Sequence, residues 1–177
     1  MDHHPDWRLE LSPADLCTQY TPDGSVASAL TWAEMVADGR LAEAWPRTGP
    51  LFRLTLTRHW CWRNRAALHR DGHDPALVAA ALADDGPAHV LWPMFARSQR
   101  PPGAGDATAT GMARWVAAGP PEPIGPDLEV VELLAAESAM ASRPTPALTL
   151  LLRLGPAGWL VDGHGRSPVQ PGWPPCR

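Results

Sequence analysis

Residues 51–71 form the longest segment of this chain that contains neither glycine nor proline. Because the sequence has 21 prolines and 15 glycines among 177 residues, few stretches are long enough for an uninterrupted helix. The segment LFRLTLTRHWCWRNRAALHR, residues 51–70, carries two Trp, two His and five Arg. We predict that it forms one central helix, against which the rest of the chain packs.

The apolar residues of this segment fall on two opposite sides of a helical wheel. A helix that is apolar on two sides is expected to lie between other elements. An alternating pattern in the same segment would also fit a strand, but the length of the segment favours a helix. One side of the helix carries Phe52, Leu56, Trp60 and Ala67, and the other carries Leu54, Cys61 and Leu68.

Helical patterns also precede and follow the central segment. Gly39 is typical of the end of a helix, and Pro46 cannot continue one. Asp74 and Pro75 are typical of the cap and the first position of a new helix. The predicted helices cover 25–37, 41–45, 51–70 and 76–83, and a short amphipathic segment covers 89–98.

The C-terminal part of the chain changes from a helical period to the alternation that is typical of strands. The sequence Gly155-Pro156-Ala157-Gly158 predicts a hairpin turn between the last two strands. Helices first and an antiparallel meander afterwards predict an α+β fold, with N-terminal helices packed on a curved, mainly antiparallel sheet. The predicted strands cover 112–117, 128–137, 147–154 and 159–163, joined by connections at 120–126 and 142–146.

The distribution of proline and glycine predicts the limits of the folded unit. We expect a single α+β domain, whose helical part covers 25–98 and whose sheet part covers 112–165, with a loop at 99–111. Residues 1–24 are expected to be an irregular arm. The tail at 166–177 is too rich in proline for regular structure, and Trp173 is expected to hold it against the domain.

The charge balance excludes some classes of partner. The net charge is −4, and all 15 basic residues are arginine, so a general binder of nucleic-acid backbones is not expected. The abundance of Arg, Ala and Pro is typical of a GC-rich bacterial genome. No apolar run is long enough to cross a membrane, and the N-terminus is acidic where a signal peptide would be basic, so we expect a cytoplasmic protein.

No pattern in the sequence indicates a cofactor or a metal. Cys17, Cys61 and Cys176 lack the spacing of a zinc site or a disulfide framework, and inert thiols are the better interpretation. The string His69, Asp71, His73 and Asp74 resembles a set of metal ligands, but capping and turn chemistry already explains most of its members.

His59 is the first candidate for chemistry, as a general base near a cavity. Arg63 lies four residues later on the same helical side and could hold a carboxylate or an enolate-like oxygen, and Trp60 and Trp62 could line an aromatic pocket. The alternative is a core histidine with one hydrogen bond, next to an arginine paired with a carboxylate. Structural ion pairs of this kind often resemble functional ones.

Glu132 is the second candidate, because it is the only charge on one face of the predicted strand 128–137. Burial would raise the pKa of its carboxyl group and make it a usable acid or base. If Glu132 and His59 pointed into one cavity, they would form a base and the group that orients it. The alternative is a salt bridge to Arg153 or to Arg114.

The last strand and the tryptophans supply the remaining candidates. Asp162 and His164 are predicted to share a face with Leu160 and could bind a polar ligand, although an ordinary turn would explain the same sequence. The chain has nine Trp, of which Trp115 and others fall in predicted elements. Some of them are expected to line a pocket for a flat ligand.

Several segments together resemble a known superfamily. These are AWPRTGPLFRLTLTRHWCWRNR, HVLWPMFARSQ, PDLEVVELLA and ALTLLLRLGPAGWLVDGHG, and the last, ending in GWLVDG, is the most specific. They resemble the cone-shaped nuclear transport factor 2-like (SnoaL/ketosteroid-isomerase-like) superfamily, over roughly residues 25–173. The resemblance implies a curved sheet around a pocket closed by helices. The chain differs from that pattern by a helical insertion at 74–98 and by the lack of an early strand pair, and no catalytic motif carries over.

Two functions follow as hypotheses. In the first, the protein binds a small apolar or aromatic ligand and transforms it by general acid/base chemistry, with His59 as base and Glu132 or Arg63 assisting. In the second, it is a non-catalytic interaction module whose core is filled by Trp side chains, and it forms a homodimer through the open face of its sheet. A closed, solvent-filled cavity that reaches His59 would favour the first hypothesis, and a solid core would favour the second.

Overall fold

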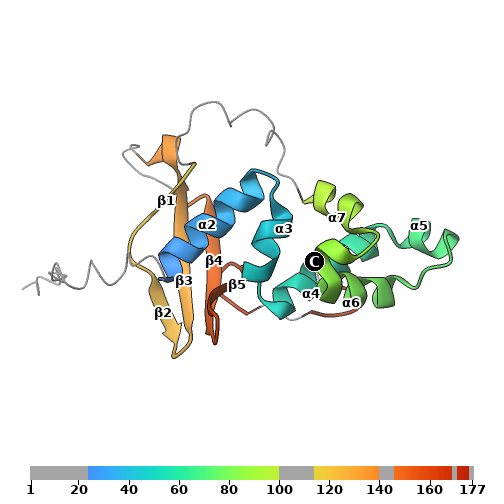
Figure 1. Ribbon diagram of the computed structural model, residues 1–177. Helices are drawn as coiled ribbons and strands as arrows, with labels where there is room; N and C mark the ends of the chain where they lie inside the picture. The colour runs from blue at the N-terminus through green and yellow to red at the C-terminus, as the bar shows by residue number, and fades with distance from the viewer. Residues whose placement is uncertain (1–23, 100–113, 140–145, 169–170, 176–177) are drawn as a thin grey trace, which may run out of the picture.

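The computed structural model describes residues 24–99, 114–139, 146–168 and 171–175. Helices come first and an antiparallel sheet follows, which confirms the predicted α+β class (Figure 1). The predicted arm at 1–24 and the loop at 99–111 lie outside the described residues, apart from Gly24 and Gln99. The helices are α2 Ser25–Ala37, α3 Leu41–Ala44, α4 Pro50–Arg63, α5 Arg65–Arg70, α6 Pro75–Asp85 and α7 Trp92–Ser98, with short 3-10 turns η1 Trp45–Arg47, η2 Gly86–Ala88 and η4 Ala136–Ser138.

The sheet has the order β1-β3-β4-β5, and β2 also pairs with β3. Both β1 and β2 run antiparallel to β3, so they behave as two parts of one interrupted edge strand. β2 lies in the segment that we predicted to be a connection. Pro123 within β2 is tolerated because an edge strand needs fewer of its N–H groups for pairing. The strands are β1 Trp115–Ala117, β2 Glu122–Gly125, β3 Leu128–Ala135, β4 Leu148–Gly155 and β5 Gly158–His164.

Helix α2 covers one face of this sheet (Figure 1). Its buried residues include Ala29 and Trp32, which are 0% and 3% exposed. Leu150 and Leu152 of β4 are fully buried in the same cluster, on the sheet face that α2 covers. The side chain of Glu34 accepts hydrogen bonds from the backbone N–H groups of Arg114 (2.7 Å) and Trp115 (3.2 Å), which attaches α2 to β1.

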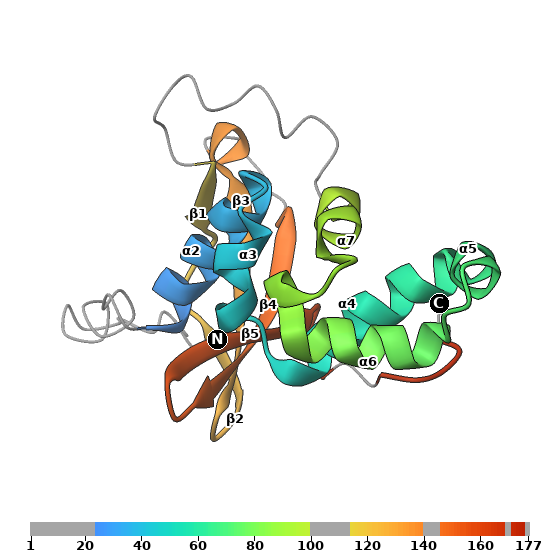
Figure 2. The ribbon, with the colours of Figure 1, turned by 45° about the vertical axis from the view of Figure 1, so that its right-hand side comes forward.

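The central helix differs from the prediction in two ways. It breaks at Asn64, whose Nδ2 donates a 2.8 Å hydrogen bond to the carbonyl of Trp60, a local bond of the kind by which Asn competes with helical structure. After its first turns, which contact β5, α4 runs away from the sheet and packs on α6 and α7 (Figures 1 and 2). Both predicted apolar sides contain buried residues, but α6 and α7, not the sheet, provide most of the cover.

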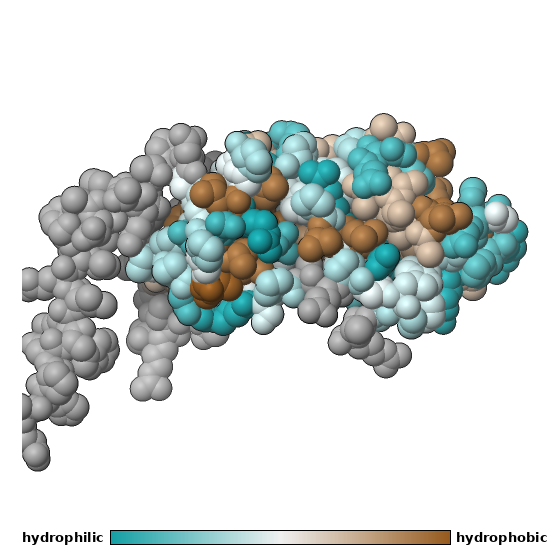
Figure 3. Space-filling model, turned by 90° about the horizontal axis from the view of Figure 1, so that it is seen from below, coloured by the Kyte–Doolittle hydropathy of each residue, from teal (hydrophilic) through white to brown (hydrophobic). Residues whose placement is uncertain are grey.

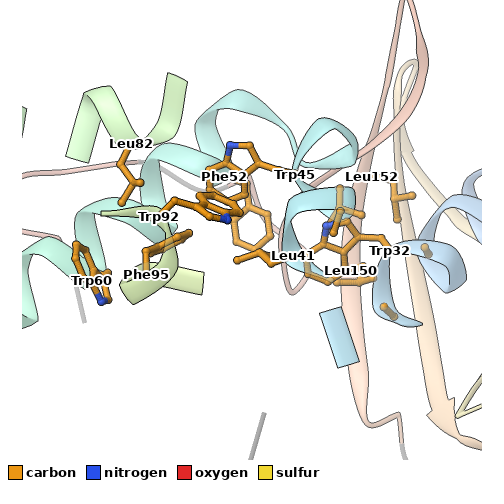
Figure 4. Packing of buried hydrophobic residues seen from close by; sticks show 14 of the residues in the cluster. Trp32, Leu41, Trp45, Phe52, Trp60, Leu82, Trp92, Phe95, Leu150 and Leu152 are labelled. Carbon is orange, nitrogen blue, oxygen red and sulfur yellow. The ribbon is translucent and has the colours of Figure 1, made fainter. Parts of the chain in front are cut away.

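One continuous apolar core joins the sheet to the helices (Figure 4). Trp45 lies in the middle of it, with its ring centroid 5.0 Å from that of Trp92 and 5.6 Å from that of Phe95. Trp60 contacts the other side of Phe95 at 6.0 Å. Edge-to-face packing of this kind adds to the stabilisation that burial alone provides. The aromatic residues therefore hold the α4–α6–α7 layer to the part of the molecule that contains the sheet.

Several local predictions are confirmed. Asp74 caps α6, since its Oδ1 accepts hydrogen bonds from the N–H groups of Ala76 (2.8 Å) and Leu77 (3.3 Å). Gly155 and Gly158 pair across the β4–β5 hairpin. Trp173 packs edge-on against Trp62 with ring centroids 5.5 Å apart, so the tail lies against α4 as predicted.

Candidate functional site

An apolar hollow lies between α2 and the sheet. Its volume is about 310 Å³, within the range of small-molecule sites. Two indole rings and one imidazole form part of its wall, and aliphatic side chains form most of the rest. We call it the apolar pocket, and its lining consists of Trp32, Ala33, Val36, Ala37, Leu41, Leu56, Gln99, Trp115, Leu148 and His164.

His164 reaches this pocket because of an irregularity in β5. The register shifts between Leu151 and Leu152, so that His164 stands opposite Leu150, on the face that α2 covers. Part of the residue is exposed to solvent, and its ring packs edge-on against Trp32 (5.9 Å) and Phe52 (5.1 Å). Burial lowers the pKa of His164, because the charged imidazolium loses hydration there. The imidazole is therefore neutral at pH 7.

Trp115 and its neighbour Arg114 fix the wall of the pocket on the β1 side. Arg114 makes a 3.0 Å ion pair with Asp38 at the end of α2. The indole Nε1 of Trp115 is buried and has no hydrogen-bond partner in the described part of the chain. An unpartnered buried donor costs free energy, and such donors are rare in native structures. Trp115 thus lines the pocket with an unused donor group, and its predicted role in ligand binding stays a prediction.

A second hollow, of about 630 Å³, lies between α4 and α7. Its lining combines apolar side chains with two guanidinium groups and one imidazole, and includes no carboxylate among the described residues. We call it the basic groove, and its lining consists of Leu56, His59, Trp60, Arg63, Asn64, Met94, Arg97, Ser98 and Gln99.

The structure brings His59, Trp60 and Arg63 together in this groove, but it corrects the predicted burial. His59 and Arg63 are exposed, and only Trp60, at 7% exposure, belongs to the core. The prediction failed because it placed the sheet against this side of the helix, where α7 leaves an open groove. His59 therefore lies on the surface of a hollow and not inside a closed cavity.

Glu132 does not share a cavity with His59, and the predicted pair of a base and its orienter is wrong. Its strand neighbours Val131 and Leu133 belong to the core under α2, so Glu132 points to the opposite face of the sheet. Its side chain is 32% exposed and accepts a 2.7 Å hydrogen bond from Arg166. The predicted partners, Arg153 or Arg114, were therefore also wrong.

Arg166 lies between two carboxylates, those of Glu132 and Glu122. Its hydrogen bond to Glu132 is the main cause that raises the pKa of Arg166, followed by its bond to Glu122. All three side chains are substantially exposed, so the cluster contributes little to stability. It connects the end of β5 to β2 and β3, and we assign it a structural role.

Two further predicted ligand-binding residues have other partners. Asp162 is 3% exposed and accepts a 2.9 Å hydrogen bond from Nε of Arg153, whose side chain is 41% exposed, and this ion pair lies away from both hollows. It does not share a face with His164, because the register shift separates them. Trp62 packs between Trp173 and the guanidinium of Arg65, which lies 4.4 Å from its ring centroid.

Sequence reasoning missed Arg97, Gln99 and Val36 as site residues. Arg97 is the one arginine in the amphipathic segment 89–98, and this was the available signal. Arg97 and Arg63 line the same groove because of the way α7 packs on α4, and the hydrophobic pattern of a sequence does not predict such packing. Val36 was predicted correctly as part of a helical stripe, but the gap beside it depends on the distance between α2 and β1.

The remaining reactive groups of the described residues offer no alternative centre. Cys61 is fully buried, and burial raises the pKa of its thiol to about 12, so it stays protonated. Within the described ranges, no three His, Cys, Asp or Glu side chains converge as metal ligands, and no helix has the length and apolarity needed to span a bilayer. Comparisons with protein-family models, curated proteins and solved structures find no match.

Proposed function

We propose that this protein binds a small apolar or aromatic molecule in the apolar pocket. The observation that carries the proposal is a concave, mostly apolar hollow with two indoles and one neutral imidazole in its wall. Ligand sites commonly combine such a lining with a few polar groups that orient the ligand. Here those groups are His164 and Gln99.

Histidine is the residue that most often serves in general acid/base chemistry, and the lining of each hollow supplies one histidine. His164 is neutral at pH 7 and could accept a proton, and His59 lies in the adjoining groove. In the described part of the chain, no carboxylate makes a hydrogen bond to either imidazole. The proposal therefore rests on binding, and catalysis by His59 would add to it only for a ligand that extends into the groove.

We also propose membership of the nuclear transport factor 2-like superfamily. Two features support it: helices that precede an antiparallel meander, and a pocket between the first helix and the sheet. The layer of α4, α6 and α7 beside the sheet would then be an addition specific to this chain. Membership by itself does not identify a ligand.

The pocket can be tested by filling it. Val36 is half-buried and lines the pocket, so Val36→Phe should occupy the space with limited strain on the core. Leu77→Phe is the matched control, because Leu77 is 71% exposed on α6. Titration with neutral naphthylmethanol, followed by calorimetry, should show binding to the wild type and to Leu77→Phe, and at least tenfold weaker binding to Val36→Phe. Equal binding to all three proteins would refute the proposal.

A second candidate function is a non-catalytic interaction module that forms a homodimer through the sheet. The observation in its favour is that Trp45, Trp92 and Phe95 fill the core beside α4 with their own rings. Exposed apolar residues of the sheet are Ile124 (41%) and Leu154 (47%). On the face that Figure 3 shows, hydrophobic residues form separate groups and not one broad patch. Sedimentation equilibrium of wild type and Leu154→Glu would detect such a dimer.

A further inference from the structure

The apolar pocket and the basic groove adjoin each other. Leu56 of α4 and Gln99, which follows α7, line both hollows. One ligand can therefore place an apolar body against Trp32 and Trp115 and extend past Leu56 toward Arg63. The two hollows differ in chemical character: the first is mostly aromatic and aliphatic, and the second adds two cationic groups to an apolar lining.

The two arginines of the groove have no partner among the residues that the structure describes. In the described part of the chain, neither Arg63 nor Arg97 makes an ion pair or a side-chain hydrogen bond. The other described arginines are either paired with a carboxylate (Arg40, Arg114, Arg153 and Arg166) or donate to a backbone carbonyl (Arg53, Arg58 and Arg65), apart from Arg47 and Arg70, which lie outside the groove. This occurs in a chain with more acidic than basic residues, 19 against 15. The groove thus gathers positive charge where the protein as a whole is negative.

Helix dipoles explain only part of this arrangement. Arg63 and Arg97 each lie in the last turn of a helix, where a cation is favourable in any protein. That effect does not require the two guanidinium groups to line one hollow. Arg70 is also in a last turn and has no ion pair in the described part of the chain, but it lies outside the groove, so it serves as a control.

We infer that the ligand is an amphipathic anion, with an apolar body in the apolar pocket and a carboxylate or similar anionic group held by Arg63 and Arg97 in the basic groove. The inference rests on the proposed function and adds the chemical class of the ligand. A guanidinium group matches a carboxylate in shape and can form two parallel hydrogen bonds to it. His59 and Asn64 lie in the same groove and add polar groups around the anion.

The test uses a pair of probes with the same body. One is naphthalene with a butanoate chain, and the other is the corresponding neutral alcohol. We expect the carboxylate to bind the wild type roughly tenfold more tightly than the alcohol at low salt, and this advantage should fall as ionic strength rises. In the double variant Arg63→Gln/Arg97→Gln the advantage should disappear, while binding of the alcohol stays unchanged. Arg70→Gln should behave as wild type.

The outcomes separate the two proposals. If alcohol and carboxylate bind the wild type equally, or if the advantage survives in the double variant, the inference about the anion is wrong and the proposed function stands. If neither probe binds, or if Val36→Phe binds the alcohol as well as the wild type does, the proposed function is wrong and the inference falls with it. Circular dichroism of the double variant verifies that it is folded.

Discussion

The indole Nε1 of Trp32 donates a 2.9 Å hydrogen bond to the hydroxyl of Thr48, and that hydroxyl donates a 2.9 Å bond to the carbonyl of Ala44. Thr48 is completely buried and also forms an isolated bridge with Val161 of β5. The side chain of Thr48 therefore connects α2 to the end of α3, and its backbone adds a link to the sheet. It also orients Trp32, which forms part of the wall of the apolar pocket.

Replacing Thr48 with valine should destabilise the protein. The substitution keeps the shape but leaves the Trp32 N–H buried without its acceptor, which costs about 1–3 kcal/mol. Thr48→Ser keeps the hydroxyl and should lose less, since only one methyl group is removed. Urea unfolding gives the free energy of unfolding for both variants. A Thr48→Val variant as stable as Thr48→Ser would contradict the role of the hydrogen bond.

Gly49 is required by its close approach to Asp162. A Cβ at this position would overlap the carboxylate and lie 3.3 Å from the Cα of Asp162. We expect Gly49→Ala to lower the free energy of unfolding by about 1–3 kcal/mol, the usual cost of overpacking. Gly119→Ala is the control. A Cβ added at Gly119 would meet no described atom within 4 Å apart from its chain neighbours, and the φ angle of Gly119 is not positive. Thermal unfolding of both variants measures the difference, and equal melting temperatures would rule out the clash.

The lowered pKa of His164 predicts a loss of stability in acid. Below the ordinary value of 6.5, the unfolded chain binds a proton at this residue that the folded chain does not. The free energy of unfolding should therefore fall as pH drops from about 6.5, until the folded imidazole also becomes protonated. His164→Gln should reduce this slope.

His73→Gln is the control for that experiment, since His73 is exposed in the turn before α6. Its curve of unfolding free energy against pH should follow the wild type. Urea unfolding at several pH values between 4 and 8 measures the slopes, a range that brackets the ordinary histidine value. If His164→Gln keeps the full acid dependence, His164 is not the group responsible.

The parts of the fold with local chemical signals could be predicted from the sequence. Helix 25–37 has a strong apolar stripe and a glycine after it, and its predicted limits agree with α2. Asp74 and Pro75 specify the start of α6, and the four residues 155–158 specify the last hairpin. In each case the determining contacts lie within a few residues of one another, which is why they can be seen in the sequence.

The parts that failed depend on contacts between distant segments. The break at Asn64 had a weak signal in the asparagine itself, but the helical pattern continued across it. β2 was missed because Pro123 argues against a strand, and only its pairing with β3 makes one. The partner of Glu132 could not be predicted, because Arg166 is 34 residues away and reaches it past the end of β5.

The candidate site was predicted in composition but not in arrangement. Trp115 and His164 were expected to bind a ligand, and both line the apolar pocket. His59, Trp60 and Arg63 were expected to act beside Glu132, but they line a separate groove with Arg97. The types of residue follow from the sequence, while their grouping depends on how α4 and α7 pack and on the register shift in β5.

The most direct test of the proposed ligand site uses the indole N–H signals of the nine tryptophans. Trp32 and Trp115 line the apolar pocket, whereas Trp62 lies against Trp173 and outside both hollows. In a proton–nitrogen correlation spectrum, with signals assigned by Trp→Phe variants, saturating naphthylmethanol should shift the indole signals of Trp32 and Trp115 and leave that of Trp62 in place. A spectrum in which Trp32 and Trp115 do not respond would contradict ligand binding in the apolar pocket.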